Sequence, residues 1–282
     1  MTVRVIPRLD IKGPNLVKGI HLEGLRILGP PERFARHYYE SGADELIYMD
    51  AVASLYGRNS LVEIIERTAA TVFIPLTVGG GLRSIEDISQ VLRVGADRIA
   101  LNTAAIERPG FISEAASKFG ASTIAVSIEA KRHDDGGYTA FTDNGRDDTG
   151  KEVTAWARQA TELGAGEIIL TSIDREGTGK GYDLDLITRV ATAVSVPVVA
   201  CGGAGNAGHM VAAVTGGYAD AVATASALHY PFAGTLQAEG FELESGGAFK
   251  VVEEKIGHDR IGGASLGEIK DLLAAGGIDC RH

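Results

Sequence analysis

Two sets of glycines in this chain have the spacing expected of anion-binding loops. They follow two short β-rich runs and comprise Gly79, Gly80 and Gly81 in the first set and Gly202, Gly203 and Gly205 in the second. Without side chains, their backbone N–H groups can approach an anion closely. Each set has a partner segment at the end of the next run, Asn102 and Thr103 for the first and Ala225 and Ser226 for the second. One set alone could merely form a turn, but two sets in equivalent places predict two phosphate sites facing each other.

Two carboxylates follow other β-rich runs, Asp10 in VIPRLDIKG and Glu129 in IAVSIEAKR. On opposite sides of a substrate, they could work as an acid and a base if their surroundings separate their pKa values. The alternative is that each only caps a strand or pairs with a nearby lysine. Polar residues after further runs are also candidates, namely Asp50, Thr171, Ser172 and Asp174. The residues alone leave both interpretations open.

A long segment that carries Lys18 separates Asp10 from the first expected helix. Residues 12–29, KGPNLVKGIHLEGLRILG, are punctuated by glycine. Such a segment suits a mobile lid that excludes water from a substrate. The sequence therefore predicts a lid loop near Asp10.

Four charged residues stand near the starts of β-rich runs, namely Arg4, Glu45, Arg98 and Glu167. Buried charges destabilise a fold unless they are paired, and two positive with two negative charges can neutralise one another. These residues are predicted to form either a structural ring of salt bridges or a polar gate.

The elements that must position these residues are marked by a recurring phrase, in which Gly follows a helical stretch and precedes a β-rich run. It occurs as SGADELIYMD, VGADRIALNT, LGAGEIILTS and GGYADAVATA. Alternating helices and strands predict βαβ units and a parallel sheet. The expected strands are residues 3–9, 45–50, 73–78, 98–101, 123–128, 167–171, 196–201 and 219–224. An open doubly wound sheet would carry G-x-G-x-x-G after its first strand, and none follows Leu9.

An internal repeat favours a closed (β/α)₈ (TIM) barrel made of two half-barrels. TVGGGLRS resembles VACGGAGN, and GADRIALNTA resembles YADAVATASA. We expect one barrel domain over residues 1–282, since such barrels use about 250 residues. Residues 231–265 break the pattern and are predicted to be an insertion, for which we expect a hairpin, before a last helix at 266–275.

Composition narrows the classes of function. The chain is 45% hydrophobic but has no apolar run near the ~20 residues of a membrane helix, and its start lacks the zones of a signal peptide. We therefore expect a cytoplasmic protein that does not bind membranes. A net charge of −10 disfavours an extended nucleic-acid surface. Cys201 and Cys280 have no metal-ligand or redox spacing, and no histidine pair stands at i, i+4. Neither a metal nor a cofactor is expected.

The chain resembles the cyclase subunit of imidazole glycerol phosphate synthase. The likeness rests on VIPRLD, LVKG, GADELIYMDAVAS, FIPLTVGGG, GADRIALNTAA, GAGEIILTSIDREGTGKGYD and GGAG, in that order. The sixth phrase is more similar to this family than to its sister barrel, the histidine-pathway ribonucleotide isomerase. The resemblance implies use of ammonia from a glutaminase partner docked at the barrel floor. It also implies conversion of a bisphosphorylated ribulosyl-formimino aminoimidazole carboxamide nucleotide to imidazole glycerol phosphate and an aminoimidazole carboxamide nucleotide.

The resemblance also implies roles for individual residues. Asp10 would be a catalytic acid or base, Glu129 would occupy the second catalytic position, and Lys18 would belong to the closing lid. The four charges would form the ammonia gate. The substrate and phosphate positions would be Lys18, Gly80, Gly81, Asn102, Thr103, Thr171, Gly177, Gly202, Gly203, Ala225 and Ser226.

Several residues depart from the family pattern. Glu129 and Glu176 stand where the family has Asp, Arg8 where it usually has Cys, Pro30 where it usually has Asp, and Arg98 where it usually has Lys. One added methylene can move a carboxylate by roughly 1 Å, and misplacement of that size can cost about 10²-fold in rate. Two alternatives therefore stay open: a paralogue that channels ammonia to a surface-sugar precursor, and a ligand-binding barrel that only activates a glutaminase.

Overall fold

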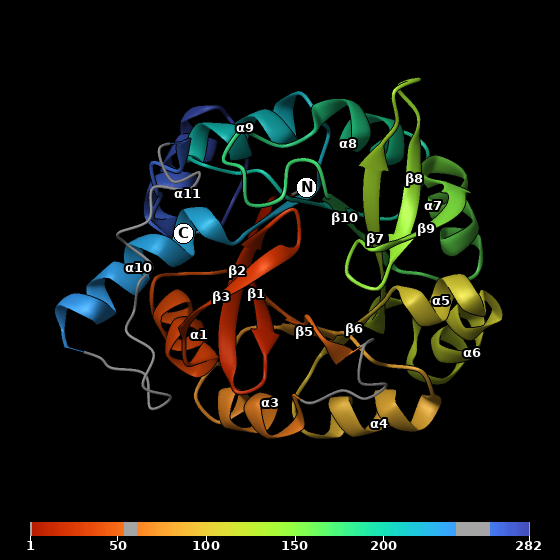
Figure 1. Ribbon diagram of the computed structural model, residues 1–282, viewed down its shortest axis with the longest axis horizontal. Helices are drawn as coiled ribbons and strands as arrows, with labels where there is room; N and C mark the ends of the chain where they lie inside the picture. The colour runs from red at the N-terminus through yellow and green to blue at the C-terminus, as the bar shows by residue number, and fades with distance from the viewer. Residues whose placement is uncertain (1, 54–60, 241–259, 282) are drawn as a thin grey trace.

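Parallel strands close on themselves in the computed structural model, which describes residues 2–53, 61–240 and 260–281 (Figure 1). In order around the barrel these strands are β1 (Arg4–Lys12), β4 (Leu46–Asp50), β5 (Leu76–Gly79), β6 (Arg98–Leu101), β7 (Ile124–Arg132), β10 (Glu167–Ser172), β11 (Val198–Cys201) and β12 (Ala221–Thr224). Pairing of β12 with β1 and of β7 with β10 closes the barrel. The predicted (β/α)₈ architecture is confirmed, and the open sheet is excluded.

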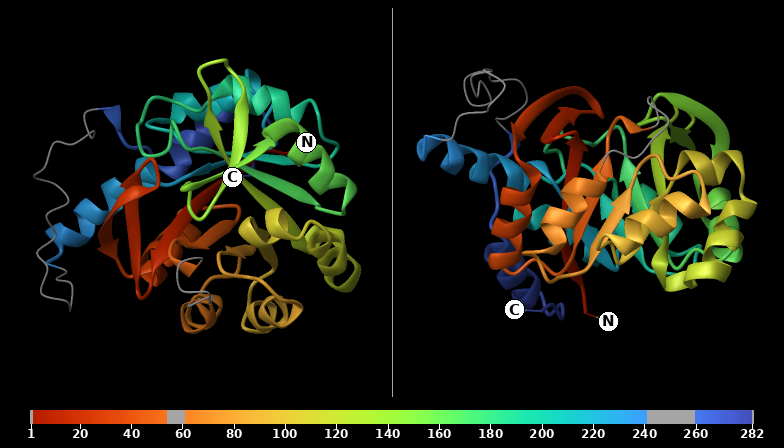
Figure 2. Two further views of the ribbon diagram at one scale, coloured as in Figure 1. Left: turned by 45° about the vertical axis from the view of Figure 1, so that its right-hand side comes forward. Right: turned by 90° about the horizontal axis from the view of Figure 1, so that it is seen from below.

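Helices surround the strands on the outside, as two further views make plain (Figure 2). They are α1 (Pro31–Glu40), α3 (Val62–Ala69), α4 (Ile85–Arg93), α5 (Thr103–Glu107), α6 (Gly110–Phe119), α7 (Val153–Glu162), α8 (Leu184–Ala191), α9 (Ala207–Thr215), α10 (Ser226–Ala238) and α11 (Leu266–Ala275). A 3₁₀ turn covers Ala121–Thr123. Side chains of Ser84, Asp183 and Asn206 cap helices by accepting backbone N–H groups of the first turn, which explains where α4, α8 and α9 begin.

Two strands begin later than their β-rich runs because proline interrupts them. The run at 73–78 contains Pro75 and the run at 196–201 contains Pro197, and proline has no N–H to donate to a sheet. The carbonyls of both prolines still accept bonds from the neighbouring strands. Phe73 consequently lies outside β5, with its side chain 75% exposed at the amino end of the barrel.

Most of the core of the described residues lies in two parts. A large apolar layer lies between the strands and the helices, and it includes the buried Trp156. A smaller cluster fills the barrel interior with Ile6, Ile47, Met49, Ala100, Ala125, Ile169, Val199, Cys201, Ala221 and Ala223. Because side chains alternate along a strand, each barrel strand except β5 supplies both parts; the alternate residues of β5 are Thr77 and Gly79.

Two antiparallel hairpins extend the barrel at the carboxyl ends of its strands, which we call the mouth (Figure 1). The first, β2 (Asn15–Ile20) and β3 (Glu23–Gly29), pairs with β1. It occupies the predicted lid loop, which is therefore a paired hairpin rather than an irregular loop. The second, β8 (Tyr138–Thr142) and β9 (Asp147–Glu152), pairs with β7 and was not predicted.

The predicted insertion does not begin at residue 231. Helix α10 continues through Pro231 to Ala238, so a hairpin starting at 231 is wrong. Residues 241–259 lie outside the described residues. The last helix, α11, has the predicted bounds and packs against α9 and β1. Among the helices of the described ranges, none combines the length and apolar character needed to cross a membrane.

Candidate functional site

Both glycine loops lie at the mouth and cannot accept side chains. Gly80 and Gly203 have φ values of +93° and +107°. A Cβ on Gly80 would lie 2.5 Å from the Asp50 carbonyl oxygen, and one on Gly203 would lie 2.3 Å from the Gly181 carbonyl oxygen. Only glycine fits such close backbone approaches.

Each loop lines its own pocket with the partners that the sequence predicted. The first pocket is lined by Gly80, Gly81, Asn102 and Thr103 and also by Glu129 and Arg8. The second, which is smaller, is lined by Gly177, Gly202, Gly203, Ala225 and Ser226. In the strand order, β5 and β6 lie opposite β11 and β12. The two pockets therefore face each other across the mouth.

Between the pockets, Asp10 is buried and held by two cations. Arg8 donates from Nε to Asp10 Oδ1 at 2.9 Å, and Lys18 Nζ lies 3.4 Å from Asp10 Oδ2. Burial alone would raise the pKa of Asp10, but the charges of Arg8 and Lys18 hold it below its ordinary value. Asp10 is therefore an anion at neutral pH.

Glu129 lies in a different environment. Its Oε2 accepts a bond from the backbone N–H of Gly145 at 2.8 Å, and the side chain is buried. Burial raises the pKa of Glu129 to about 7, against the lowering effects of Arg8 and the Gly145 N–H. Glu129 thus exchanges a proton near neutral pH while Asp10 stays ionised, which is the separation that an acid and base pair requires.

Lys18 belongs to the site itself and not only to its cover. It projects from β2 into the mouth, is 3% exposed, and forms ion pairs with Asp10 and Glu176. Burial lowers the pKa of Lys18, and the charge of Asp10 opposes that effect. Glu176, one methylene longer than the Asp usual in the family, extends from the segment after β10 and forms an ion pair with Lys18 at the mouth.

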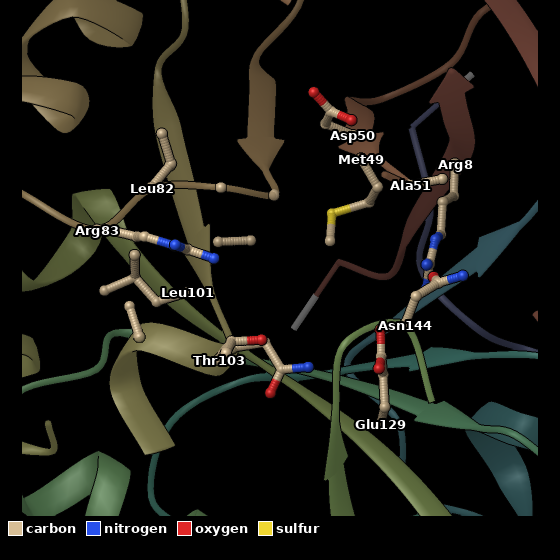
Figure 3. A pocket seen from close by; sticks show the side chains of 15 residues that line it. Arg8, Met49, Asp50, Ala51, Leu82, Arg83, Leu101, Thr103, Glu129 and Asn144 are labelled. Atoms are coloured by element: carbon tan, nitrogen blue, oxygen red, sulfur yellow. The ribbon is translucent and has the colours of Figure 1, made fainter. Parts of the chain in front are cut away.

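The two hairpins meet beside the first pocket, which Asn144 lines. Asn144, in the β8–β9 turn, donates to the Leu22 carbonyl at 3.1 Å. The first hairpin also contacts the segment after β10, where the backbone N–H of His21 donates to the Glu176 carbonyl at 2.9 Å. Leu22 also packs with Phe141 and Ile173. Figure 3 shows Arg8, Asn144 and Glu129 together along one side of this pocket, with Thr103 on the other.

Thr171 differs from its expected surroundings, and Gly177 and Arg8 make contacts that the sequence did not predict. Thr171 is fully buried, and its hydroxyl accepts a bond from Arg8 Nη1 at 2.9 Å, so it lies behind Arg8 and lines neither pocket. Gly177 lies where a Cβ would come within 2.4 Å of the Gly19 carbonyl oxygen, which gives it a role in seating the first hairpin. Arg8, which departs from the family pattern, contacts Asp10 and Thr171. Its alternation with Asp10 along one strand was the available signal.

At the opposite end, the floor, the four charges form a closed charge ring of Arg4, Glu45, Arg98 and Glu167. Arg4 and Arg98 each pair with both glutamates. Burial lowers the pKa of Arg4, but the charges of Glu167 and Glu45 raise it by more, so that it lies above its ordinary value. The apolar interior cluster lies between this ring and Asp10. Within residues 2–53, 61–240 and 260–281, no group of His, Cys, Asp and Glu could hold a metal ion.

Comparison with known proteins places this geometry in a family. A family model described as "Histidine biosynthesis protein" matches residues 4–232. A protein of Legionella pneumophila named "Imidazole glycerol phosphate synthase subunit HisF" is 60% identical over 204 residues, covering 72% of this chain and 96% of the relative. A protein of the same name from Synechococcus sp. (strain CC9311) is 47% identical over 248 residues, covering 86% and 93%.

Proposed function

Because the chain belongs to the histidine biosynthesis family, and within it to the HisF subunits of imidazole glycerol phosphate synthase, we propose that it is the ammonia-dependent cyclase of that synthase. It acts in histidine biosynthesis as a carbon–nitrogen lyase, with the cytoplasm as its proposed location. Its substrate is the bisphosphorylated ribulosyl-formimino aminoimidazole carboxamide nucleotide. The products are imidazole glycerol phosphate and the aminoimidazole carboxamide ribonucleotide.

One observation carries this proposal: two glycine-lined pockets face each other across a mouth that holds two carboxylates of different acidity. Two pockets on opposite sides of one mouth suit an elongated substrate with a phosphate at each end. Gly81 with Thr103 would hold one phosphate, and Gly203 with Ser226 the other. The reacting carbons would then lie between Asp10 and Glu129.

The proposed chemistry needs both carboxylates. Ammonia that attacks the ribulosyl carbonyl must lose protons, and the carbonyl oxygen must gain them before it leaves as water. Ring closure and cleavage of a carbon–nitrogen bond then release the second product. Asp10, held as an anion, suits the proton acceptor, and Glu129, which titrates near pH 7, suits the donor.

The ammonia supply follows from the floor. We propose that a glutaminase subunit docks there, and that the charge ring admits ammonia to the apolar interior above it. Phe73 and Tyr218 precede β5 and β12 at the same end and are 75% and 62% exposed, as expected of aromatic anchors for a partner. Co-purification with the glutaminase encoded in the same genome tests this, and a Phe73→Ser/Tyr218→Ser variant that binds equally well contradicts the anchors.

Turnover tests the reaction. Purified chain given ammonium and the nucleotide substrate should release both products, and Asp10→Asn should lower kcat by about 10²- to 10⁴-fold with substrate still bound. Tight binding without any turnover by the unchanged protein would exclude the cyclase. Neither relative is named for a sugar pathway, so the amidating and non-enzymatic alternatives are not favoured.

A further inference from the structure

Arg8 occupies the centre of the mouth and is fixed there by three strands. It precedes Asp10 by two residues in β1, so both side chains point into the barrel. Its Nε donates to Asp10 Oδ1 at 2.9 Å, and its Nη1 donates to Thr171 Oγ1 of β10 at 2.9 Å and to Cys201 Sγ of β11 at 3.3 Å. The residue is 3% exposed. A guanidinium held on several sides keeps one position.

The backbone of Arg8 is anchored as well. Strand β12 pairs with β1 only as far as Pro7, where it ends at Thr224. The Arg8 carbonyl is bonded instead to Nε2 of His229 at 2.8 Å, and His229 Nδ1 is bonded to the Tyr38 hydroxyl at 2.6 Å. Burial and the charge of Lys18 lower the pKa of His229 to about 3, so it stays neutral and donates through Nε2. This anchor does not titrate near neutral pH.

Charged and titratable groups approach Arg8 from several elements of the mouth. They are Asp10 of β1, Lys18 of β2, Asp50 at the end of β4, Glu129 of β7, Asp143 in the β8–β9 turn, Glu176 after β10, Cys201 of β11 and His229 of α10. Lys18 is shared between Asp10 and Glu176, whereas among the residues that the structure describes Arg8 forms an ion pair with Asp10 alone. Glu129 forms no ion pair within the described parts of the chain and takes a backbone N–H instead.

We propose that Arg8 is a positioning residue that divides the work between the two carboxylates, fixing Asp10 as the proton acceptor and leaving Glu129 as the proton donor. The division follows from the ion pairs, since Arg8 and Lys18 pair with Asp10 and Glu176 and neither of them pairs with Glu129. Buried without an ion pair, Glu129 is the carboxylate that keeps its proton. The pKa directions agree, because Arg8 is the main lowering influence on Asp10 while burial outweighs Arg8 at Glu129.

The proposal deepens the cyclase assignment and rests on it for the reaction that the two carboxylates serve. It also links two departures from the family pattern, Arg8 and Glu129, because the guanidinium and the longer carboxylate share the first pocket. The neutral cysteine that is usual in the family at position 8 cannot hold Asp10 ionised in this way. Arg8 and Glu129 should therefore act as a coupled pair.

The direct test titrates the carboxyl carbons by NMR in the ligand-free protein. In the unchanged chain Asp10 should stay ionised from pH 5 to 8, while Glu129 titrates near pH 7. In Arg8→Gln and Arg8→Met the pKa of Asp10 should rise by about one to three pH units, and Glu129 should titrate at higher pH. Arg8→Lys should keep Asp10 ionised. Arg36→Met, which removes an exposed arginine paired with Glu40, is the matched control and should shift neither group.

The pH dependence of ammonium-driven turnover is the second readout. Loss of Arg8 should move both the acid and the alkaline limb of the kcat/KM profile to higher pH, because the acceptor must be ionised and the donor protonated. A lower kcat with unmoved limbs would show a merely structural role and overturn the proposal. So would titration of Asp10 above pH 5 in the unchanged protein, a result that needs no variant to fold. If the carboxylates titrate as expected but nothing turns over, the cyclase assignment fails and the control of Asp10 by Arg8 stands.

Discussion

Replacing Glu129 by Gln should change how the stability of the barrel depends on pH. Glu129 has an ordinary pKa of 4.5 and, because of burial, a pKa of about 7 in the folded chain. Between these values the folded state binds more protons than the unfolded state. The contribution of this group is therefore complete below pH 4.5 and is lost as the pH rises through 7. The slope is about 1.4 kcal/mol per pH unit, or about 3 kcal/mol in all.

Glutamine keeps the size of protonated Glu129 but cannot ionise. The unchanged chain should therefore lose about 3 kcal/mol relative to Glu129→Gln between pH 4.5 and pH 7. Urea unfolding at half-unit steps of pH measures this difference, and groups that both proteins share cancel. Glu268→Gln, at an exposed helix cap, is the control and should give no such trend in this range, because its pKa lies below the ordinary value. If the unfolding free energies of the unchanged chain and of Glu129→Gln change with pH in parallel, Glu129 is not a carboxyl group that burial keeps protonated.

Three further predictions address other parts of the molecule. His229→Gln should remove a loss of stability at low pH, since the pKa of His229 in the folded chain is lowered to about 3. As the pH falls below 6.5, the unchanged chain should lose about 1.4 kcal/mol of unfolding free energy per pH unit relative to the variant. Equal dependence of the two unfolding free energies on pH, measured with urea, would contradict this prediction. Gly203→Ala should raise the KM for the bisphosphate about tenfold or more, because its Cβ would lie 2.3 Å from the Gly181 oxygen; Gly234→Ala, with open space around it, is the control. Glu167→Gln should lower the free energy of unfolding by about 1–3 kcal/mol and should reduce glutamine-driven turnover more than ammonium-driven turnover. An equal loss of both would argue against a gate.

Much of the fold could be predicted because its signals are local. The Gly-Ala-Asp phrases mark where helices end and strands begin, and the glycines of both loops are needed where the backbone has positive φ or close neighbours. The charge ring was also predictable, since Glu45, Arg98 and Glu167 occupy one place in a repeated phrase. Equivalent places in repeated units converge at one end of a barrel.

The parts that sequence missed depend on long-range contacts. Lys18 and Glu176 are 158 residues apart and meet only when the first hairpin folds over the mouth. The β8–β9 hairpin carries a weak alternating pattern, and its register with β7 is what brings Gly145 to Glu129. Arg8 could be identified as unusual, but its contacts with Thr171 and Cys201 require the closed barrel.

The connectivity of the charge ring has a consequence for how it can open. Each arginine bridges both glutamates, so the four side chains form a loop of contacts in which no single residue is indispensable. Arg98 is the most exposed member at 27%, and its contact with Glu167 is the longest at 3.6 Å. If Arg98 swings out, Arg4 still joins Glu45 to Glu167. The floor can thus open at one corner without coming apart, and the three residues left behind carry a net negative charge.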